Sequence, residues 1–99
     1  MKFLWTYEFD IENAEEISCK NRELDKAIEK HPNKYPKLQT AYMTALGKGF
    51  RIIEADTEEQ LNQLVMFFHP LERWEIKPIF EGKKVSHVWR KNLVSRVEY

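Results

Sequence analysis

The stretch that decides the fold is "TALGKGFRIIEADTEEQL", residues 44–61. A Gly-Lys-Gly loop at 47–49 leads into the run "FRIIEA", and Thr57 then precedes two acidic residues and Gln60. Two glycines allow the backbone to reverse tightly, so the loop predicts a hairpin turn between two strands. Thr57 with Gln60 three residues later fits a capping box, which predicts that a helix starts there.

The glycine loop also has two functional alternatives. A dinucleotide loop needs a third glycine and a following helix, and a P-loop needs a longer spacing that ends in Lys-Ser/Thr; neither pattern is present. Residues 48–55, "KGFRIIEA", resemble the RNP1 strand of RNA-recognition motifs in their Lys-Gly-Phe opening and at Ile53. Ile52 and Ala55 replace aromatic residues there, and Glu54 adds a negative charge. We therefore favour the turn.

Patterns on either side complete the order of elements. Residues 2–9, "KFLWTYEF", alternate in the way of a central strand. A helix is expected from a capping box at Asn13 and Glu16, or from Asp10, to Lys30, because His31 precedes a proline. Its apolar stripe is Ala14, Ile17, Leu24 and Ile28.

The remaining segments are a second strand at 37–46, a helix at 57–69, a fourth strand at 73–80 and a last helix at 82–96. Pro78 places the fourth strand at a sheet edge. The last helix is expected to turn Val85, Val88, Trp89 and Leu93 inward. This order predicts an α+β fold with a ferredoxin-like βαββαβ antiparallel sheet and a C-terminal helix, in a single domain over residues 1–99.

Composition narrows the classes of protein. The 99 residues include 16 basic and 16 acidic side chains, so no net charge draws the chain to nucleic acid or to a membrane surface. Cys19 is the single cysteine, which excludes an internal disulfide. No segment is long and apolar enough for a signal peptide or a membrane span, so a soluble cytoplasmic protein is expected.

Strand parity raises the question of what covers the sheet. One set on a shared parity is Trp5, Tyr7, Phe50, Ile52, Trp74 and Ile76, and the opposite set is Leu4, Thr6, Ile53, Ala55 and Ile79. Both sets are mainly apolar. Helices cover one face of such a sheet, so we expect a second subunit to cover the other, which gives a homodimer through the sheet faces.

A carboxylate among these aromatic residues is the candidate functional group. Glu54 shares the parity of Phe50 and Ile52, and a pocket wall is predicted from Glu54, Tyr7, Trp5, Trp74 and His69. The alternative is that Glu54 is a solvated residue at a strand end, paired with Arg51, Lys48 or another surface base. His31, His69 and His87 are scattered without metal-ligand spacing, so neither a metal nor another cofactor is expected.

Basic residues are concentrated near the C-terminus. From Lys83 to Arg96 the chain carries five basic residues and no acidic one. This pattern fits the solvated face of the last helix. A patch for nucleic acid or another anion is the alternative.

Four stretches carry a resemblance that spans nearly the whole chain: "MKFLWTYEF", "HPNKYPK", "GKGFRIIEADTEEQL" and "WEIKPIF". They resemble a family of small uncharacterised proteins with the dimeric α+β barrel fold. That fold superfamily includes quinol and antibiotic-biosynthesis monooxygenases, haem-degrading enzymes and stress-response barrels. The resemblance implies a small ligand between the sheet and the helices or inside the barrel, and it implies no particular reaction.

The sequence therefore predicts a homodimer that holds a small apolar or aromatic ligand in a sheet-lined pocket. A cofactor-less monooxygenase that uses Glu54, Tyr7 and His69 is one alternative, and an RNA-binding sheet is another. Nucleic acid and membranes are not expected as partners. The residues leave open whether the protein is an enzyme.

Overall fold

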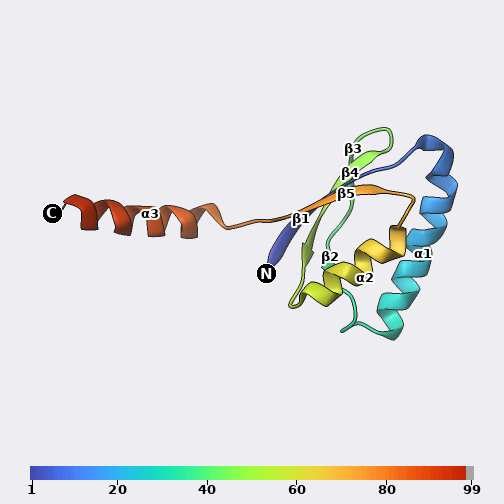
Figure 1. The fold of residues 1–99 in the computed structure, drawn as a ribbon, viewed down its shortest axis with the longest axis horizontal. Coiled ribbons are helices and arrows are strands. Elements are labelled where there is room, and N and C mark those ends of the chain that lie inside the picture. The colour runs from blue at the N-terminus through green and yellow to red at the C-terminus, as the bar shows by residue number, and fades with distance from the viewer. Residues whose placement is uncertain (98–99) are drawn as a thin grey trace.

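The structure is a computed structural model that describes the backbone of residues 1–97 and the side chains of residues 1–92. Its strands are β1 (Lys2–Glu8), β2 (Lys37–Leu38), β3 (Tyr42–Ala45), β4 (Lys48–Glu54) and β5 (Arg73–Pro78). Its helices are the 3₁₀ helix η1 (Ile11–Asn13) and the α-helices α1 (Ala14–Lys30), α2 (Glu58–Phe68) and α3 (Gly82–Val97). The predicted mixed α+β class is confirmed (Figure 1).

The described strands form one five-stranded antiparallel sheet in the order β2-β4-β1-β5, and β3 pairs with the other end of β4. The second strand predicted over residues 37–46 is thus two short strands. Between them the chain stays attached to β4 through Gln39, whose N–H donates to the carbonyl of Ile52 at 3.0 Å. The Gln39 carbonyl accepts from Nε of Arg51 at 2.6 Å. Strand β5 lies at the sheet edge, as Pro78 indicates.

A hairpin turn joins β3 and β4, as predicted, but Leu46 and Gly47 form it, and Lys48 and Gly49 already belong to β4. Gly47 has a φ of 77°, a conformation that a side chain makes unfavourable, and its carbonyl accepts a hydrogen bond from the N–H of Phe9 at 2.8 Å. The turn therefore fixes the β3–β4 hairpin against the chain that leaves β1.

The strand registers confirm the expected parity sets for β1 and β5, where Trp5 faces Ile76 and Tyr7 faces Trp74, and show that the sets are wrong for β4. Trp5 lies opposite Arg51, and Leu4 lies opposite Ile52. Trp5 and Tyr7 therefore share a face with Arg51 and Ile53, whereas Phe50 and Ile52 share the other face with Leu4 and Thr6. The physical reason is that the pairing register decides which residues of neighbouring strands share a face. Alternation along each strand separately does not reveal that register.

Helices α1 and α2 pack on the same face of the sheet, which is the core face. Ile17 and Leu24 from α1 meet Leu64 and Phe68 from α2 over two sheet residues, Trp5 and Ile53. All six side chains are at most 4 % exposed. Burial of apolar side chains of this size contributes on the order of 1.5–3 kcal/mol each, so this layer is the main source of stability. Tyr35, from the predicted connector, also joins the core.

The two α-helix starts differ in how well the sequence describes them. At α2 the Thr57 side chain accepts from the N–H of Gln60, and the Gln60 side chain accepts from the N–H of Thr57, so the capping box is confirmed. At α1 the predicted capping box of Asn13 and Glu16 is wrong: in the described chain Asn13 makes no side-chain cap bond, and η1 precedes the helix. Asp10, the other predicted cap, is the N-cap residue of η1, but its side chain makes no cap bond and pairs with Arg73.

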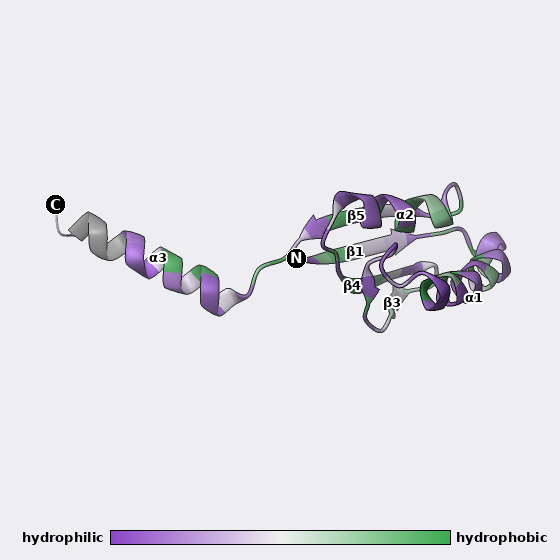
Figure 2. Cartoon of the chain, turned by 90° about the horizontal axis from the view of Figure 1, so that it is seen from below, coloured by the Kyte–Doolittle hydropathy of each residue, from purple (hydrophilic) through white to green (hydrophobic). Residues whose placement is uncertain are grey.

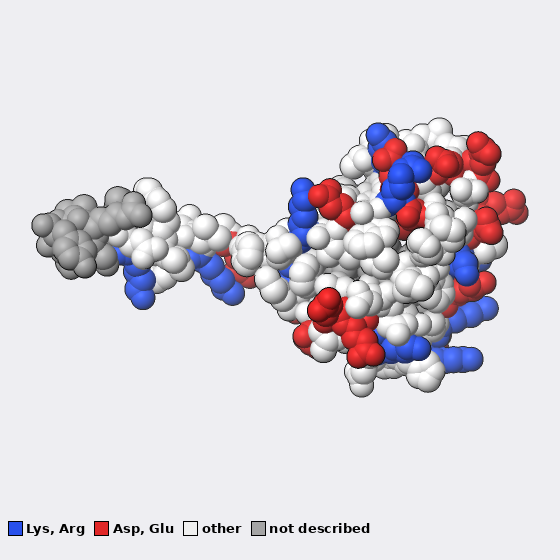
Figure 3. All heavy atoms as spheres, in the orientation of Figure 1, with Lys and Arg blue, Asp and Glu red and all other residues white. Residues whose placement is uncertain are grey.

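The whole molecule measures 60 × 31 × 20 Å, and helix α3 projects away from the rest of it (Figure 1). Every residue from Phe80 to Asn92 is exposed, so the expectation that Val85, Val88 and Trp89 turn inward is wrong. The side chain of Leu93 lies outside the described residues. Figure 2 shows apolar segments on this isolated helix, and Figure 3 shows basic side chains along it. Within the described part, no helix combines the length and the hydropathy needed to cross a membrane.

Candidate functional site

The sheet face opposite α1 and α2 contains a hollow of about 530 Å³. Its floor comes from the outward residues of the two central strands, Leu4 and Thr6 on β1 and Phe50 on β4, and Trp74 adds to its wall from β5. We call this cavity the outer hollow. No helix of the described chain covers the sheet face on which it lies (Figure 1). Tyr42 on β3 stacks on Phe50 with ring centroids 5.4 Å apart, which extends the aromatic surface.

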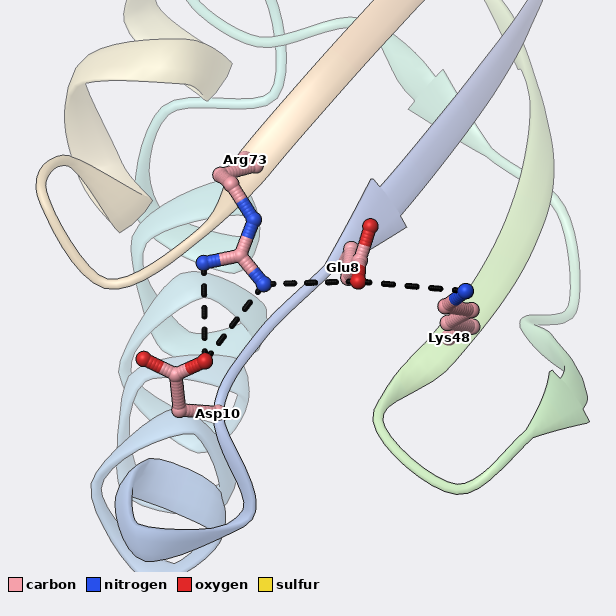
Figure 4. A network of polar contacts seen from close by, with 4 residues as sticks. All are labelled: Glu8, Asp10, Lys48 and Arg73. Atoms are coloured by element: carbon pink, nitrogen blue, oxygen red, sulfur yellow. Dashed lines mark hydrogen bonds and ion pairs between the residues drawn. The ribbon is translucent and has the colours of Figure 1, made fainter.

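Charged side chains close one end of the outer hollow. Arg73 lies between two carboxylates, with its Nη2 3.4 Å from Oε1 of Glu8 and 3.4 Å from Oδ1 of Asp10. Lys48 reaches the same Glu8 oxygen at 3.9 Å, so Glu8 links two cations (Figure 4). These side chains are all well exposed, and surface pairs of this kind contribute little to stability. The rim therefore places charged side chains, which can leave these weak ion pairs to contact another group, beside an apolar floor.

A second cavity, of about 310 Å³, lies on the helix side of the sheet. Its wall contains Trp5 and Tyr7 from β1, Arg51 from β4, and Glu72 just before β5. We call it the helix-side cavity. Trp5 is 3 % exposed and Glu72 is 8 % exposed. The indole Nε1 of Trp5 and Oε1 of Glu72 are buried without a hydrogen-bond partner in the described chain.

The protonation of this second cavity is altered by its surroundings. Burial raises the pKa of Glu72 to about 7, and the positive charge of Arg51 partly opposes that shift. Burial also raises the pKa of the Tyr7 hydroxyl; Arg51 lowers it in part, and Glu72 raises it further. Glu72 is therefore the carboxyl that can gain or lose a proton near neutral pH, the property that acid-base chemistry needs.

The structure brings together some of the predicted site residues and separates others. Trp5 and Tyr7 lie side by side, with ring centroids 5.3 Å apart. Trp74 lies opposite Tyr7 in the sheet but is 46 % exposed. His69 is exposed at the C-terminal end of α2.

Glu54 lies at the far end of β4, where it faces Lys2 on β1 and Lys37 on β2. It is exposed, and Tyr7 faces Gly49 at the opposite end of the strand, so the two do not form one pocket. The solvated strand-end alternative fits this position. Two of the partners named for it do not, because Lys48 pairs with Glu8 and Arg51 with the Gln39 carbonyl. The surface bases opposite Glu54 are Lys2 and Lys37.

Sequence reasoning missed Glu72 and the role of Arg51. A signal for Glu72 exists in the run "LERWEI", where position 72 has the parity of Trp74 and Ile76 and therefore belongs to the apolar face. Arg51 likewise has the parity of Ile53. A charged residue on the core parity of a strand is expensive to bury, and it marks a site to inspect.

The similarity to a known family covers nearly the whole chain. Residues 1–93 match the family described as a domain of unknown function, DUF3303. The chain belongs to this family. No curated protein and no solved structure matches it.

Proposed function

We propose that the protein is a homodimer that holds a small apolar or aromatic molecule in the outer hollow, with the second copy covering the sheet. The observation that carries the proposal is the uncovered apolar floor of Leu4 and Phe50 at the centre of the sheet, with a volume of about 530 Å³. Ligand pockets commonly have volumes of roughly 300–1,000 Å³ and mainly apolar walls. A second subunit would remove this floor from water and enclose the ligand.

The strand order supports the same arrangement. If β2 and β3 are counted as one interrupted strand, the order β2/β3-β4-β1-β5 matches that of a ferredoxin-like sheet. In such a sheet each of the two central strands begins a βαβ unit. Two such sheets facing each other form the dimeric α+β barrel, and the outer hollow then lies inside it. The ion-paired rim of Glu8 and Arg73 would border the entrance.

The enzymatic alternative draws on a different feature. A monooxygenase-like reaction needs a group that accepts a proton near neutral pH, and Glu72 beside Tyr7 supplies one. The set first predicted for that chemistry does not support it, since Glu54 and His69 are exposed on separate parts of the fold. The RNA alternative would use Phe50 on the outer face, where Glu8 and Glu75 add negative charge.

Native mass spectrometry at micromolar concentration tests the proposal. We expect the measured mass to be twice the mass of one chain. A co-purified molecule would appear as additional mass that is lost when the protein is denatured. Phe50→Ala should release that molecule, whereas Met66→Ala, an equally apolar truncation of an exposed residue on α2, should not. A monomer without bound mass overturns the proposal. Retention on RNA that weakens with salt would favour the RNA-binding sheet instead.

A further inference from the structure

Two buried polar atoms without partners line the same cavity. The N–H of Trp5 and Oε1 of Glu72 both belong to side chains more than nine-tenths buried, and both side chains line the helix-side cavity. A buried polar group left unpaired costs roughly 1–3 kcal/mol. Two atoms without a partner among the described residues, at one cavity, indicate a polar partner that is not part of the described chain.

The balance of donors and acceptors indicates what that partner carries. Trp5 Nε1 can only donate, and Arg51 has used Nε on the Gln39 carbonyl, which leaves its terminal nitrogens as further donors. The Tyr7 hydroxyl can also donate. Glu72 becomes a donor too when its carboxyl is protonated. A wall with several donors and a guanidinium favours an acceptor group that bears negative charge.

The rest of the wall combines apolar side chains with the polar α1 residues Ser18, Asn21 and Asp25. Phe9 and Ile17 contribute from β1's continuation and from α1, and Met43 contributes from β3. A volume of about 310 Å³ lies at the lower end of the usual range for ligand pockets. These walls suit a ligand body of about one ring.

We propose that the helix-side cavity binds a small aromatic carboxylate, whose anionic group accepts hydrogen bonds from Trp5, Arg51 and the protonated side chain of Glu72. This site differs from the outer hollow of the proposed function: Tyr7 lines both cavities, whereas Trp5, Arg51 and Glu72 line only the helix-side cavity. Each can fail while the other holds.

Binding at this site is coupled to a proton. The charged or titratable groups that face Glu72 across the cavity are Tyr7 from β1, Arg51 from β4 and Asp25 from α1, while β3 and the loop before it supply Met43 and Ala41. A bound carboxylate places a second negative charge near Glu72, so the complex requires Glu72 to keep its proton. Burial already raises the pKa of Glu72 to about 7. Affinity should therefore fall as the pH rises above that value.

Calorimetric titration with benzoate tests the proposal, with benzyl alcohol as the uncharged comparison of similar size. Wild-type protein should bind benzoate about tenfold or more weakly at about pH 8.5 than at about pH 6, since a proton must be taken up at the higher pH. Benzyl alcohol should bind more weakly than benzoate at the lower pH. Binding should quench or shift the fluorescence of Trp5, which Trp5→Phe would remove.

Three variants separate the roles of the charged groups. Glu72→Gln keeps a donor but has no titratable proton, so its benzoate affinity should be the same at both pH values. Arg51→Gln should weaken benzoate about tenfold or more at both. Glu29→Gln is the control, because Glu29 is an exposed acidic residue on α1 outside the cavity lining, and it should retain the pH dependence of the wild type. Circular dichroism verifies that each variant is folded.

Several results would overturn the proposal. The first is that folded wild-type protein does not bind millimolar benzoate at about pH 6. The second is that the benzoate affinity is independent of pH, and the third is that Glu72→Gln leaves its pH dependence unchanged. Benzyl alcohol binding as tightly as benzoate would overturn the anionic class. If Phe50→Ala lowers the benzoate affinity and Glu72→Gln does not alter its pH dependence, the ligand occupies the outer hollow and this assignment fails.

Discussion

Trp5 on β1 and Arg51 on β4 are direct cross-strand neighbours on the core face of the sheet. A cation thus stands beside a buried indole, in the wall of the helix-side cavity. The same register turns Phe50 and Ile52 outward, onto the face that α1 and α2 leave uncovered. One pairing therefore places the charged cavity on one side of the sheet and the apolar surface on the other.

The first prediction uses this register. Ile52→Asp places a charge on the outer face, so it should dissociate the proposed dimer while the subunit stays folded. Ile53 is 0 % exposed on the core face, and Ile53→Asp should destabilise the subunit by roughly 3 kcal/mol or more, since the carboxylate has no buried partner. Light scattering and thermal melts distinguish the two effects. Met66→Asp, at an exposed position on α2, is the control, and equal behaviour of the two isoleucine variants would contradict the assignment of faces.

The second prediction concerns the pH dependence of stability. The pKa of Glu72 is raised to about 7 in the folded protein from an ordinary value of 4.5, so between these values the folded state holds a proton that the unfolded chain releases. Stability should therefore fall as the pH rises from about 4.5 to about 7 and then level off. Glu72→Gln should remove this part of the dependence in urea denaturation, and Glu29→Gln, at an exposed position on α1, should not. Parallel pH curves for wild type and Glu72→Gln would refute the assignment.

Sequence patterns predict the elements of this fold better than its site, and particular residues show why. Thr57 and Gln60 lie within one turn of each other, so their capping box can be recognised locally. Pro36 and Tyr35 could not be identified as core, because nothing in a turn-rich connector shows what packs on it. The parity along β4 alone predicts Glu54, whereas the cavity depends on how β1, β4 and the chain before β5 align. That alignment comes from long-range pairing.

Helix α3 gives the third prediction. In the described residues its apolar side chains, Val85, Val88 and Trp89, are all more than half exposed, so the helix adds little to the stability of the sheet and of α1 and α2. A chain that ends at Glu81 should unfold cooperatively within a few degrees of the full chain, a shift equivalent to about 1 kcal/mol or less. Sedimentation of both proteins shows whether α3 contributes to assembly. A large loss of thermal stability at monomer concentrations would mean that α3 packs on its own subunit in solution.

The start of α2 provides the fourth prediction. Thr57→Ala removes the acceptor for the N–H of Gln60 and should lower the free energy of unfolding by about 1 kcal/mol. Thr57→Ser should restore most of it, because the hydroxyl is retained. Thr40→Ala, at an exposed position between β2 and β3, is the control. Chemical denaturation that gives the same value for Thr57→Ala and wild type would show that the cap contributes nothing measurable.

The last prediction returns to the glycine loop. Gly47 has the positive φ, so Gly47→Ala should cost about 1–2 kcal/mol. Gly49 does not, but a Cβ there would lie 2.6 Å from the Tyr7 hydroxyl and closer still to the Tyr42 carbonyl. Gly49→Ala should therefore displace Tyr7 or the β3–β4 pairing and cost about 1–3 kcal/mol.

Lys48 is the comparison within the same loop. It is exposed and its pair with Glu8 is long, at 3.9 Å, so Lys48→Ala should change stability by less than about 0.5 kcal/mol. Thermal melts of the three variants test this order, and a titration with inorganic phosphate and with RNA tests the loop's chemistry. If wild-type protein binds either anion and Lys48→Ala abolishes the binding, the loop is an anion site as well as a turn.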